Sequence, residues 1–230
     1  MEFNTLTKEF ADSAPLFAGL GDDGESLESQ LHYTIINNRP DLDKLIRKLW
    51  ELENWSFDVD DSNSAKNASS FDTKAPCGIA IATGAGISHY IDIENFEGGK
   101  EKAITPLKDI LSNKYLSKSS HDLKRNLAAL TKIGIVPETV KEDTMIAAYL
   151  IDSSRKKFDL PTLARLNLNQ EVASEFPEDW SENQYKTCER ADWTAQLAPI
   201  FRRKIEKDDL KGIYDDIELP IVPILFEIEM

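Results

Sequence analysis

Residues Trp55-Ser-Phe-Asp-Val-Asp-Asp-Ser62 form a short apolar segment that ends in acidic residues. Its aromatic and β-branched residues predict a β-strand over 55–60. Side chains two residues apart in a strand point to the same face, so Asp58 and Asp60 are expected to lie side by side. Adjacent carboxylates repel each other unless a cation neutralises them, and Mg²⁺ or Mn²⁺ prefers such hard oxygen ligands. The simpler alternative is a strand that runs into an acidic, solvated turn.

The segments around this strand predict a layered α/β protein. Runs of apolar and β-branched residues predict strands at 31–37, 78–83 and 88–93, and a short strand at 115–118. Gly84-Ala-Gly86 separates two of these runs and predicts a β-hairpin. Apolar residues at helical spacing predict helices that start at Pro40 and Lys100 and helices over 122–133, 143–150, 160–166 and 182–207. Strands that precede and then alternate with helices are typical of the α/β class.

The charge balance limits the kind of partner that the chain can bind by itself. The 230 residues include 41 Asp and Glu against 27 Lys and Arg, a formal net charge of −14. Affinity for nucleic acid depends largely on cationic contacts with phosphates, so this balance disfavours independent DNA binding. Two distant cysteines indicate neither a disulfide framework nor a cysteine zinc site. No apolar run of about 18 residues is present, so no membrane contact and a cytoplasmic location are expected.

Four segments fall in an order that is more specific than any one of them. They are Phe57-Asp-Val-Asp-Asp-Ser62, His121-Asp-Leu-Lys-Arg-Asn126, Asp143-Thr-Met-Ile-Ala-Ala-Tyr-Leu150 and Ala191-Asp-Trp-Thr-Ala-Gln-Leu197. Together they resemble the 3′→5′ exonuclease domain of bacterial DNA polymerase I, one of the ribonuclease H-like DEDD nucleases. The resemblance covers roughly residues 30 to 230. It implies a ribonuclease H-like fold, in which a mixed central sheet has helices on both faces.

The resemblance also implies a domain organisation. Residues 1–28 correspond to a linker or tail, 29–208 to the exonuclease-like domain, and 209–230 to the start of the connection to a polymerase domain. Ile217-Glu-Leu-Pro-Ile-Val-Pro-Ile-Leu225 looks like the helix that leads into that domain. The implied parent chain is a DNA-directed DNA polymerase of replication and repair. Its polymerase domain, beyond Met230, is the expected partner, and DNA is expected to be reached only through the intact polymerase.

Active members of the family use four carboxylates to hold two metal ions, and a tyrosine orients the attacking water. Only part of that set is present here. Asp58 matches the first aspartate, and Asp60 stands where a longer glutamate is expected. Asn126 replaces the metal-binding aspartate of the second motif. In the third motif, the register set by the residues after it places Lys186 at the tyrosine and Arg190 at the last aspartate.

These replacements predict an inactive nuclease domain without a metal cofactor, retained as a structural platform for the polymerase domain. The four ligand positions carry a formal charge of −1 here instead of −4, because two aspartates remain and an arginine has been added. Arg190 is expected to pair with Asp58 or Asp60 and so replace the metal with an internal salt bridge. Asp122 and Lys124, in the second motif, are weak candidates for nucleic-acid contacts.

Two alternative functions remain open on the sequence. Tyr185 and Glu189 also have the tyrosine-to-acid spacing of four, one residue earlier in the chain. In that register the domain would be an active two-metal proofreading exonuclease, which uses Mg²⁺ or Mn²⁺ and acts on the 3′ ends of single-stranded DNA. A stand-alone nucleic-acid-binding or interaction module of the same fold is a weaker reading.

The last twenty residues predict a helix with two apolar faces. One stripe comprises Leu210, Ile213, Ile217, Ile221, Ile224 and Ile228, and the second comprises Leu219, Val222 and Phe226. A helix that is apolar on two sides is normally buried, so polymerase-domain residues are expected to cover part of it. Pro220 and Pro223 are expected to kink this helix or to interrupt its hydrogen bonding.

Overall fold

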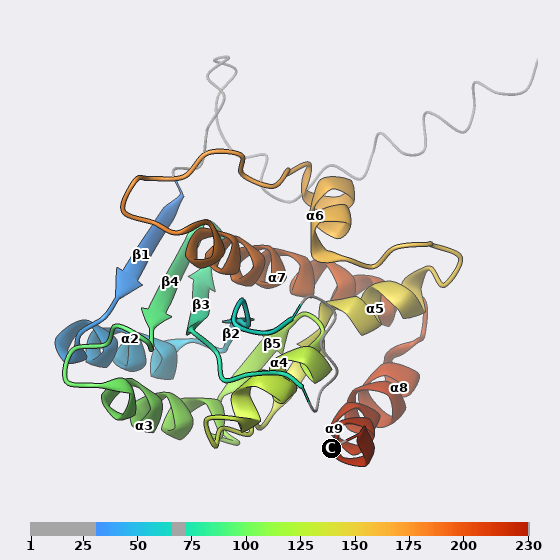
Figure 1. The fold of residues 1–230 in the computed structure, drawn as a ribbon. Helices are drawn as coiled ribbons and strands as arrows, with labels where there is room; N and C mark the ends of the chain where they lie inside the picture. Colours follow the sequence, from blue (N-terminus) through green and yellow to red (C-terminus); the bar gives the residue numbers. More distant parts are fainter. Residues whose placement is uncertain (1–30, 66–71, 230) are drawn as a thin grey trace, which may run out of the picture. The chain divides into compact units, whose positions relative to one another are not determined.

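A six-stranded mixed sheet forms the centre of the domain in the computed structural model, which describes residues 31–65 and 72–229 (Figure 1). The strands are β1 (His32–Ile36), β2 (Asn54–Asp60), β3 (Gly78–Gly84), β4 (Ile87–Asp92), β5 (Ser117–Ser120) and β6 (Val140–Asp143). Their order in the sheet is β1-β4-β3-β2-β5-β6. The β2–β3 and β3–β4 pairs are antiparallel, and the other three pairs are parallel. The mixed sheet confirms the predicted fold class.

Helices cover both faces of this sheet (Figure 1). They are α2 (Arg39–Glu51), α3 (Lys100–Leu111), α4 (Leu123–Thr131), α5 (Thr144–Ile151), α6 (Leu160–Leu168), α7 (Glu182–Lys207), α8 (Lys211–Ile213) and α9 (Leu219–Glu229). Residues of α2, α3 and α4 share one apolar cluster with the sheet. Helix α7 packs on the other face through Cys188 and Ala191. The expected linker at 1–28 lies outside the described residues.

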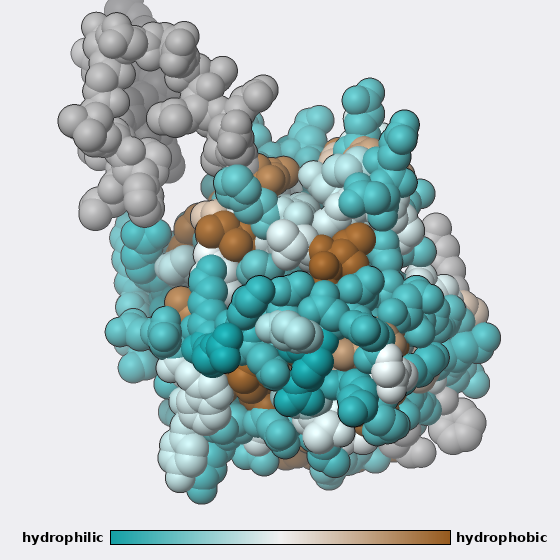
Figure 2. All heavy atoms as spheres, turned by 90° about the vertical axis from the view of Figure 1, so that its left-hand side faces the viewer, coloured by the Kyte–Doolittle hydropathy of each residue, from teal (hydrophilic) through white to brown (hydrophobic). Residues whose placement is uncertain are grey.

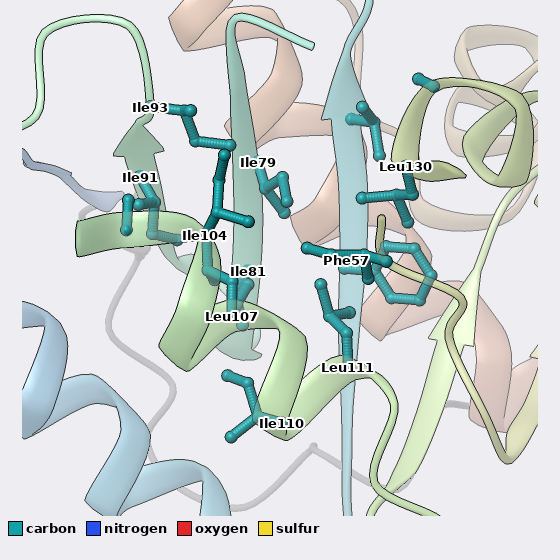
Figure 3. Close-up of a cluster of buried hydrophobic side chains, with 14 of the residues drawn as sticks. Phe57, Ile79, Ile81, Ile91, Ile93, Ile104, Leu107, Ile110, Leu111 and Leu130 are labelled. Atoms are coloured by element: carbon teal, nitrogen blue, oxygen red, sulfur yellow. The ribbon is translucent and has the colours of Figure 1, made fainter. Parts of the chain in front are cut away.

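Alternation along β2 decides which side chains enter the main core. Phe57 and Val59 point towards α3 and α4, into the cluster that Figure 3 shows around Ile79, Ile81 and Leu107. Ser56, Asp58 and Asp60 therefore point to the face that α7 covers, and the hydroxyl of Ser56 donates to the carbonyl of Ala191 in α7. Every residue of β2 after Asn54 is buried, because this strand lies inside the sheet and is covered on both faces.

The sequence prediction was wrong at the far edge of the sheet. It placed a strand at 115–118, whereas β5 spans Ser117–Ser120. It also missed β6 and started a helix at Asp143, which instead ends β6 and caps α5 by accepting hydrogen bonds from the backbone of Met145 and Ile146. The polar sequence of β5 hid the strand. Lys118 is fully buried there, because its ammonium donates to three backbone carbonyls.

The helical segment after α7 is continuous, although it contains two prolines. A π-helical turn, Tyr214–Glu218, joins α8 to α9 directly before Pro220, and Pro223 lies inside α9. The expected break is therefore a local change in hydrogen bonding, which is how helices commonly accommodate proline. Val222 and Phe226 join the main core. In the other stripe, Leu210 packs against a second apolar cluster, and the five isoleucines stay exposed. No helix in the described part of the chain is long and apolar enough to cross a membrane.

Candidate functional site

Asp58 is held by two guanidinium groups. Its side chain is 2% exposed, and its Oδ2 accepts a hydrogen bond from Nε of Arg190 on α7 at 2.5 Å. Its Oδ1 accepts from Nη1 of Arg125 on α4 at 3.2 Å. The salt bridge with Arg190 agrees with the expectation from the sequence. The second guanidinium was not anticipated, because Arg125 is the residue directly before Asn126 and matches no ligand position of the motif.

Arg125 binds the end of β2 as a planar fork. Its Nε and Nη2 donate to the two carboxylate oxygens of Asp61 at 2.9 and 2.8 Å, and Nη2 also donates to the carbonyl of Val59 at 2.9 Å. Arg190 donates to the same carbonyl at 3.2 Å. Such bidentate geometry is the most favourable one for an arginine–carboxylate pair. The two arginines thus bridge α4 and α7 across the end of β2.

The electrostatic balance at Asp58 favours the charged carboxylate. Burial alone would raise the pKa of Asp58, but the attraction of Arg190 and then of Arg125 holds that pKa below its ordinary value. The pKa of Arg125 is raised: burial acts to lower it, and the neighbouring Asp58 and Asp61 more than compensate. A buried carboxylate stays ionised only where paired cations replace the lost hydration. Here both of its cations come from the chain itself.

Asp60 is satisfied by a different neighbour. Its Oδ2 accepts a hydrogen bond from the Tyr90 hydroxyl at 2.8 Å, and its Oδ1 accepts from the backbone N–H of Ser62 at 3.1 Å. Tyr90 lies two strands away, on β4, and reaches Asp60 across Gly78 of β3. A Cβ at Gly78 would lie 2.3 Å from Cζ of Tyr90 and 2.7 Å from the carbonyl oxygen of Ile91. Only glycine therefore allows this tyrosine to cross the strand.

Asn126 completes the contacts of Asp58. Its Nδ2 donates to Oγ of Ser120 at 2.8 Å and reaches Oδ1 of Asp58 at 3.4 Å. The structure thus brings Asp58, Asn126 and Arg190 together at one end of the sheet, as expected from the order of the motifs. Asn126 is fully buried and supplies an amide donor where the family's pattern has a third acidic ligand.

The remaining third-motif candidates point elsewhere. Lys186 forms an ion pair with Glu182 one turn earlier on α7. The ring of Tyr185 packs against Tyr33, with ring centroids 5.2 Å apart. Glu189 is buried and accepts a hydrogen bond from the backbone N–H of Ala173 at 2.9 Å. None of these α7 side chains makes a hydrogen bond or ion pair with Asp58 or Asp60 within residues 31–65 and 72–229.

The candidates at the start of α4 have structural contacts. Asp122 adopts a left-handed conformation (φ 52°) and caps α4 by accepting from the backbone N–H of Arg125. Lys124 forms an ion pair with Glu229 at the end of α9, at 2.9 Å. His121, which has no metal-ligand spacing in the sequence, is buried beside this site, and its Nδ1 lies 2.9 Å from Oγ1 of Thr144. Burial lowers the pKa of His121 to about 4.

Asp143 opens one of the four motif segments, but the sequence analysis gave it no role at the site. It is 1% exposed and accepts hydrogen bonds from the backbone N–H groups of Leu123 on α4 and Met145 on α5, so it caps two helices at once. Burial raises its pKa to about 6. The signal available in the sequence was Asp143-Thr directly before an apolar run, which is a helix-capping pattern.

This donor set does not fit two divalent ions. The pair requires several carboxylates that converge without cations of their own, whereas Asp58 and Asp61 are already paired with two arginines and Asp60 accepts from Tyr90. Across the described residues, no three His, Cys, Asp or Glu side chains converge in a way suited to a metal ion. A metal ion at Asp58 would have to displace a guanidinium from either oxygen.

The comparisons with known proteins agree with the family resemblance of the sequence motifs. Residues 68–176 match the family described as "DNA polymerase I, ribonuclease H-like domain". DNA polymerase I of Pseudomonas aeruginosa is 23% identical over 91% of this chain, and that of Borreliella burgdorferi is 28% identical over 96%. Over most of its length the chain is thus similar to DNA polymerase I. It spans about a quarter of the length of these two relatives, 25% and 26%.

Solved structures of relatives have the same fold. The POL domain of Pol1 from M. smegmatis, in complex with DNA primer-template and dNTP, matches with a TM-score of 0.69 and 20% identity over 85% of this chain and 31% of that one. RNase D of Escherichia coli, an exoribonuclease, matches with a TM-score of 0.66 and 14% identity over 85% of this chain and 50% of that one. This chain thus shares its fold with parts of both proteins.

Proposed function

We propose that this chain is a DNA polymerase I exonuclease-like domain that does not hydrolyse DNA and acts as a structural platform for a polymerase domain. One observation carries the proposal. Both carboxylate oxygens of Asp58, the residue that matches the first metal ligand of the family, are bound by arginines of the same chain. The cations that neutralise this site are covalently part of the protein and take no part in phosphoryl chemistry.

The charge of the site supports the absence of a metal pair. Three aspartates and two arginines at the end of β2 leave a net charge of −1 (Asp58, Asp60, Asp61, Arg125 and Arg190). Two divalent ions bring four positive charges, and they would face fixed guanidinium groups that stay protonated at any ordinary pH. Loss of one well-placed catalytic group commonly lowers a rate by a factor of about 10²–10³, and this site departs from the active pattern at four positions.

The platform role is supported by the relatives. The two compared above are DNA polymerases I about four times as long as this chain. The exposed stripe on α9 is the surface on which we place the contact with the polymerase domain, which follows the exonuclease-like domain in the family. DNA contact then belongs to the intact polymerase, because this chain carries a net charge of −14.

A nuclease assay tests the proposal. Purified protein is incubated with 5′-labelled single-stranded DNA and Mg²⁺ or Mn²⁺, beside the variant Asp58→Asn and a buffer control. The expected result is that the protein, the variant and the buffer release the same amount of nucleotide. Metal-dependent degradation that Glu189→Gln abolishes would overturn the proposal and establish an active exonuclease in the shifted register.

A restored site provides the positive control. The combined change Asp60→Glu, Asn126→Asp, Lys186→Tyr and Arg190→Asp rebuilds the ligand set of the family, and it is made with and without Arg125→Leu. Activity is expected to appear only in these combined variants. Asn126→Asp alone is expected to stay inactive, because Arg190 remains at the metal position.

A further inference from the structure

A stripe of large apolar side chains runs along the outward face of the helical segment from α8 to α9. Its members, here called the isoleucine stripe, are exposed to between 39% and 75%: Ile213 44%, Ile217 57%, Ile221 39%, Ile224 53%, Leu225 43% and Ile228 75%. Successive residues of a helix are about 100° apart around its axis, so the four members on α9 lie on one arc of about 100°. Contiguous exposed apolar residues of this kind mark interaction surfaces more often than single ones do.

The stripe is presented by a helix whose inner side is firmly attached. Val222 and Phe226, on the inner side, belong to the main apolar core. Tyr214, in the π-helical turn, is fully buried, and its hydroxyl accepts a hydrogen bond from the backbone N–H of Asp143 at 2.8 Å. The ion pair between Lys124 and Glu229 holds the last turn against α4. The stripe is therefore a fixed surface and not a frayed helix end.

Acidic side chains border the stripe on both sides. Asp216 and Glu227 are exposed and Glu218 is half-exposed, and none of the three has an ion pair within the described residues. The acids of this segment that do pair are Asp215, with Arg202, and Glu229. The surface thus combines apolar side chains with unneutralised negative charge.

This charge pattern argues against a second copy of the chain as the occupant. In an antiparallel pair of α9 helices, Asp216 and Glu218 of one copy would face Glu227 of the other, and a parallel pair would oppose each acid to itself. Like charges across an interface are unfavourable, and each copy carries a net charge of −14. An anionic phospholipid surface is disfavoured for the same reason.

We propose that the isoleucine stripe docks an amphipathic protein segment whose own apolar stripe is bordered by lysine or arginine. The inference deepens the platform role and rests on it, since it gives the chemistry of the surface that contacts this helix. A groove of about 620 Å³ on the other flank of α9 has an apolar rim formed by Val136, Pro137, Pro220 and Pro223.

Two synthetic helical peptides test the charge requirement. Both carry a leucine stripe, bordered by lysines in one peptide and by glutamates in the other, and binding to the 230-residue chain is followed by fluorescence anisotropy. The lysine peptide is expected to bind about tenfold more tightly, because its lysines can pair with three exposed acids that repel the glutamates. The preference is expected to shrink at high salt.

Matched variants locate the binding. Asp216→Lys, Glu218→Lys and Glu227→Lys together are expected to reverse the preference towards the glutamate peptide. The same number of reversals at distant exposed acids, Glu51, Glu101 and Asp109, is expected to leave the preference for the lysine peptide in place. Ile217→Ser with Ile224→Ser is expected to weaken both complexes, and circular dichroism confirms that each variant is folded.

Three outcomes would contradict the inference. They are equal binding of the two peptides, an equal effect of the distant reversals, and a homodimer that the two serine substitutions dissociate. Each of these outcomes leaves the nuclease assay unaffected, so a failure here is distinguishable from a failure of the proposed inactivity.

Discussion

The end of β2 and the outward face of α9 differ in how their side chains are satisfied. At the end of β2, every oxygen of Asp58, Asp60 and Asp61 has a donor from the same chain. Along the helical segment from α8 to α9, six large apolar side chains remain exposed to solvent. The first region is satisfied within the described chain, and the second leaves apolar surface uncovered. This difference is what the proposal of a domain that acts by contact and not by chemistry rests on.

A second surface shows that the stripe is unusual for this protein. The side of the molecule formed by β1 and α2 is mostly hydrophilic, and its apolar residues appear as separate spots (Figure 2). Scattered apolar residues of that kind are normal on soluble proteins. In Figure 1, α9 lies at the opposite side from β1 and α2. A partner surface is thus expected beside the end of the chain and not at the β1 edge.

The largest expected effect comes from removing both arginines of the β2 site. Arg125→Leu with Arg190→Leu leaves Asp58 buried without a cation, which is expected to lower the free energy of unfolding by about 3–5 kcal/mol. Urea denaturation measures this loss. Adding Asp58→Asn to the double variant is expected to recover most of the loss, because the unpaired charge is then gone.

Metal addition sharpens the same experiment. Millimolar Mg²⁺ is expected to leave the melting temperature of the unmodified protein unchanged, because both oxygens of Asp58 are occupied. The matched control for the two arginine substitutions is Arg203→Leu, at an exposed position on α7. It is expected to change the free energy of unfolding by less than about 0.5 kcal/mol. A clear rise in the melting temperature of the unmodified protein with Mg²⁺ would show that its arginines yield to the ion.

The sequence predicted this region in part. Asp58, Asn126 and Arg190 could be placed together because each lies in a motif of fixed order, and α7 was predicted with its observed bounds. Arg125 was not predictable in the same way, because motif matching treats it as a spacer. The physical clue was the uncompensated acidic run Asp58 to Asp61, which requires nearby cations once it is buried.

The errors at the sheet edge have a related physical cause. Strand β6 is only four residues long and reads Val-Lys-Glu-Asp, so it shows no alternation of apolar and polar residues. Strand β5 contains a buried lysine, whereas lysine is almost never fully buried in folded proteins. Both strands are stabilised by parallel pairing with strands that are distant in the sequence, which no local pattern encodes.

The next largest effect is expected at Gly78. Gly78→Ala places a methyl group within 2.3 Å of Tyr90 and close to the backbone of Ile91, which is expected to cost about 1–3 kcal/mol of stability. Thermal denaturation measures the loss. Gly84→Ala is the matched control, since a Cβ at that glycine meets no atom within 4 Å. A cost at Gly84 as large as that at Gly78 would contradict the crossing geometry of Tyr90.

A smaller effect is expected from His121, which lies beside the arginine pair. Burial lowers its pKa from 6.5 to about 4, so between these values the folded state binds fewer protons than the unfolded state. Stability is therefore fully present above pH 6.5 and is lost as the pH falls towards 4. His121→Gln is expected to remove this loss of stability from the window between these two pH values.

Denaturation curves from pH 4 to pH 7 measure the difference between this variant and the unmodified protein. Asp143 acts in the opposite direction, because its pKa is raised to about 6 by burial and its protonated form is favoured in the folded state. Only the difference between the two profiles reports on His121. His32→Gln, at an exposed position, is the matched control and is expected to leave the profile unchanged.

The smallest effect is expected on the outward face of α9. Its comparison with the inward face of the same helix tests directly whether the stripe is uncovered. Ile224→Ala and Phe226→Ala lie two residues apart on one helix, but Ile224 is 53% exposed and Phe226 is 8% exposed. Phe226→Ala is expected to cost about 3–5 kcal/mol, because it opens a cavity in the main core, whereas Ile224→Ala is expected to stay within about 0.5 kcal/mol. Urea denaturation of both variants in the isolated chain gives the two values. A cost above 1 kcal/mol for Ile224→Ala would mean that the stripe is covered by the chain itself, and the contact surface would then have to lie elsewhere.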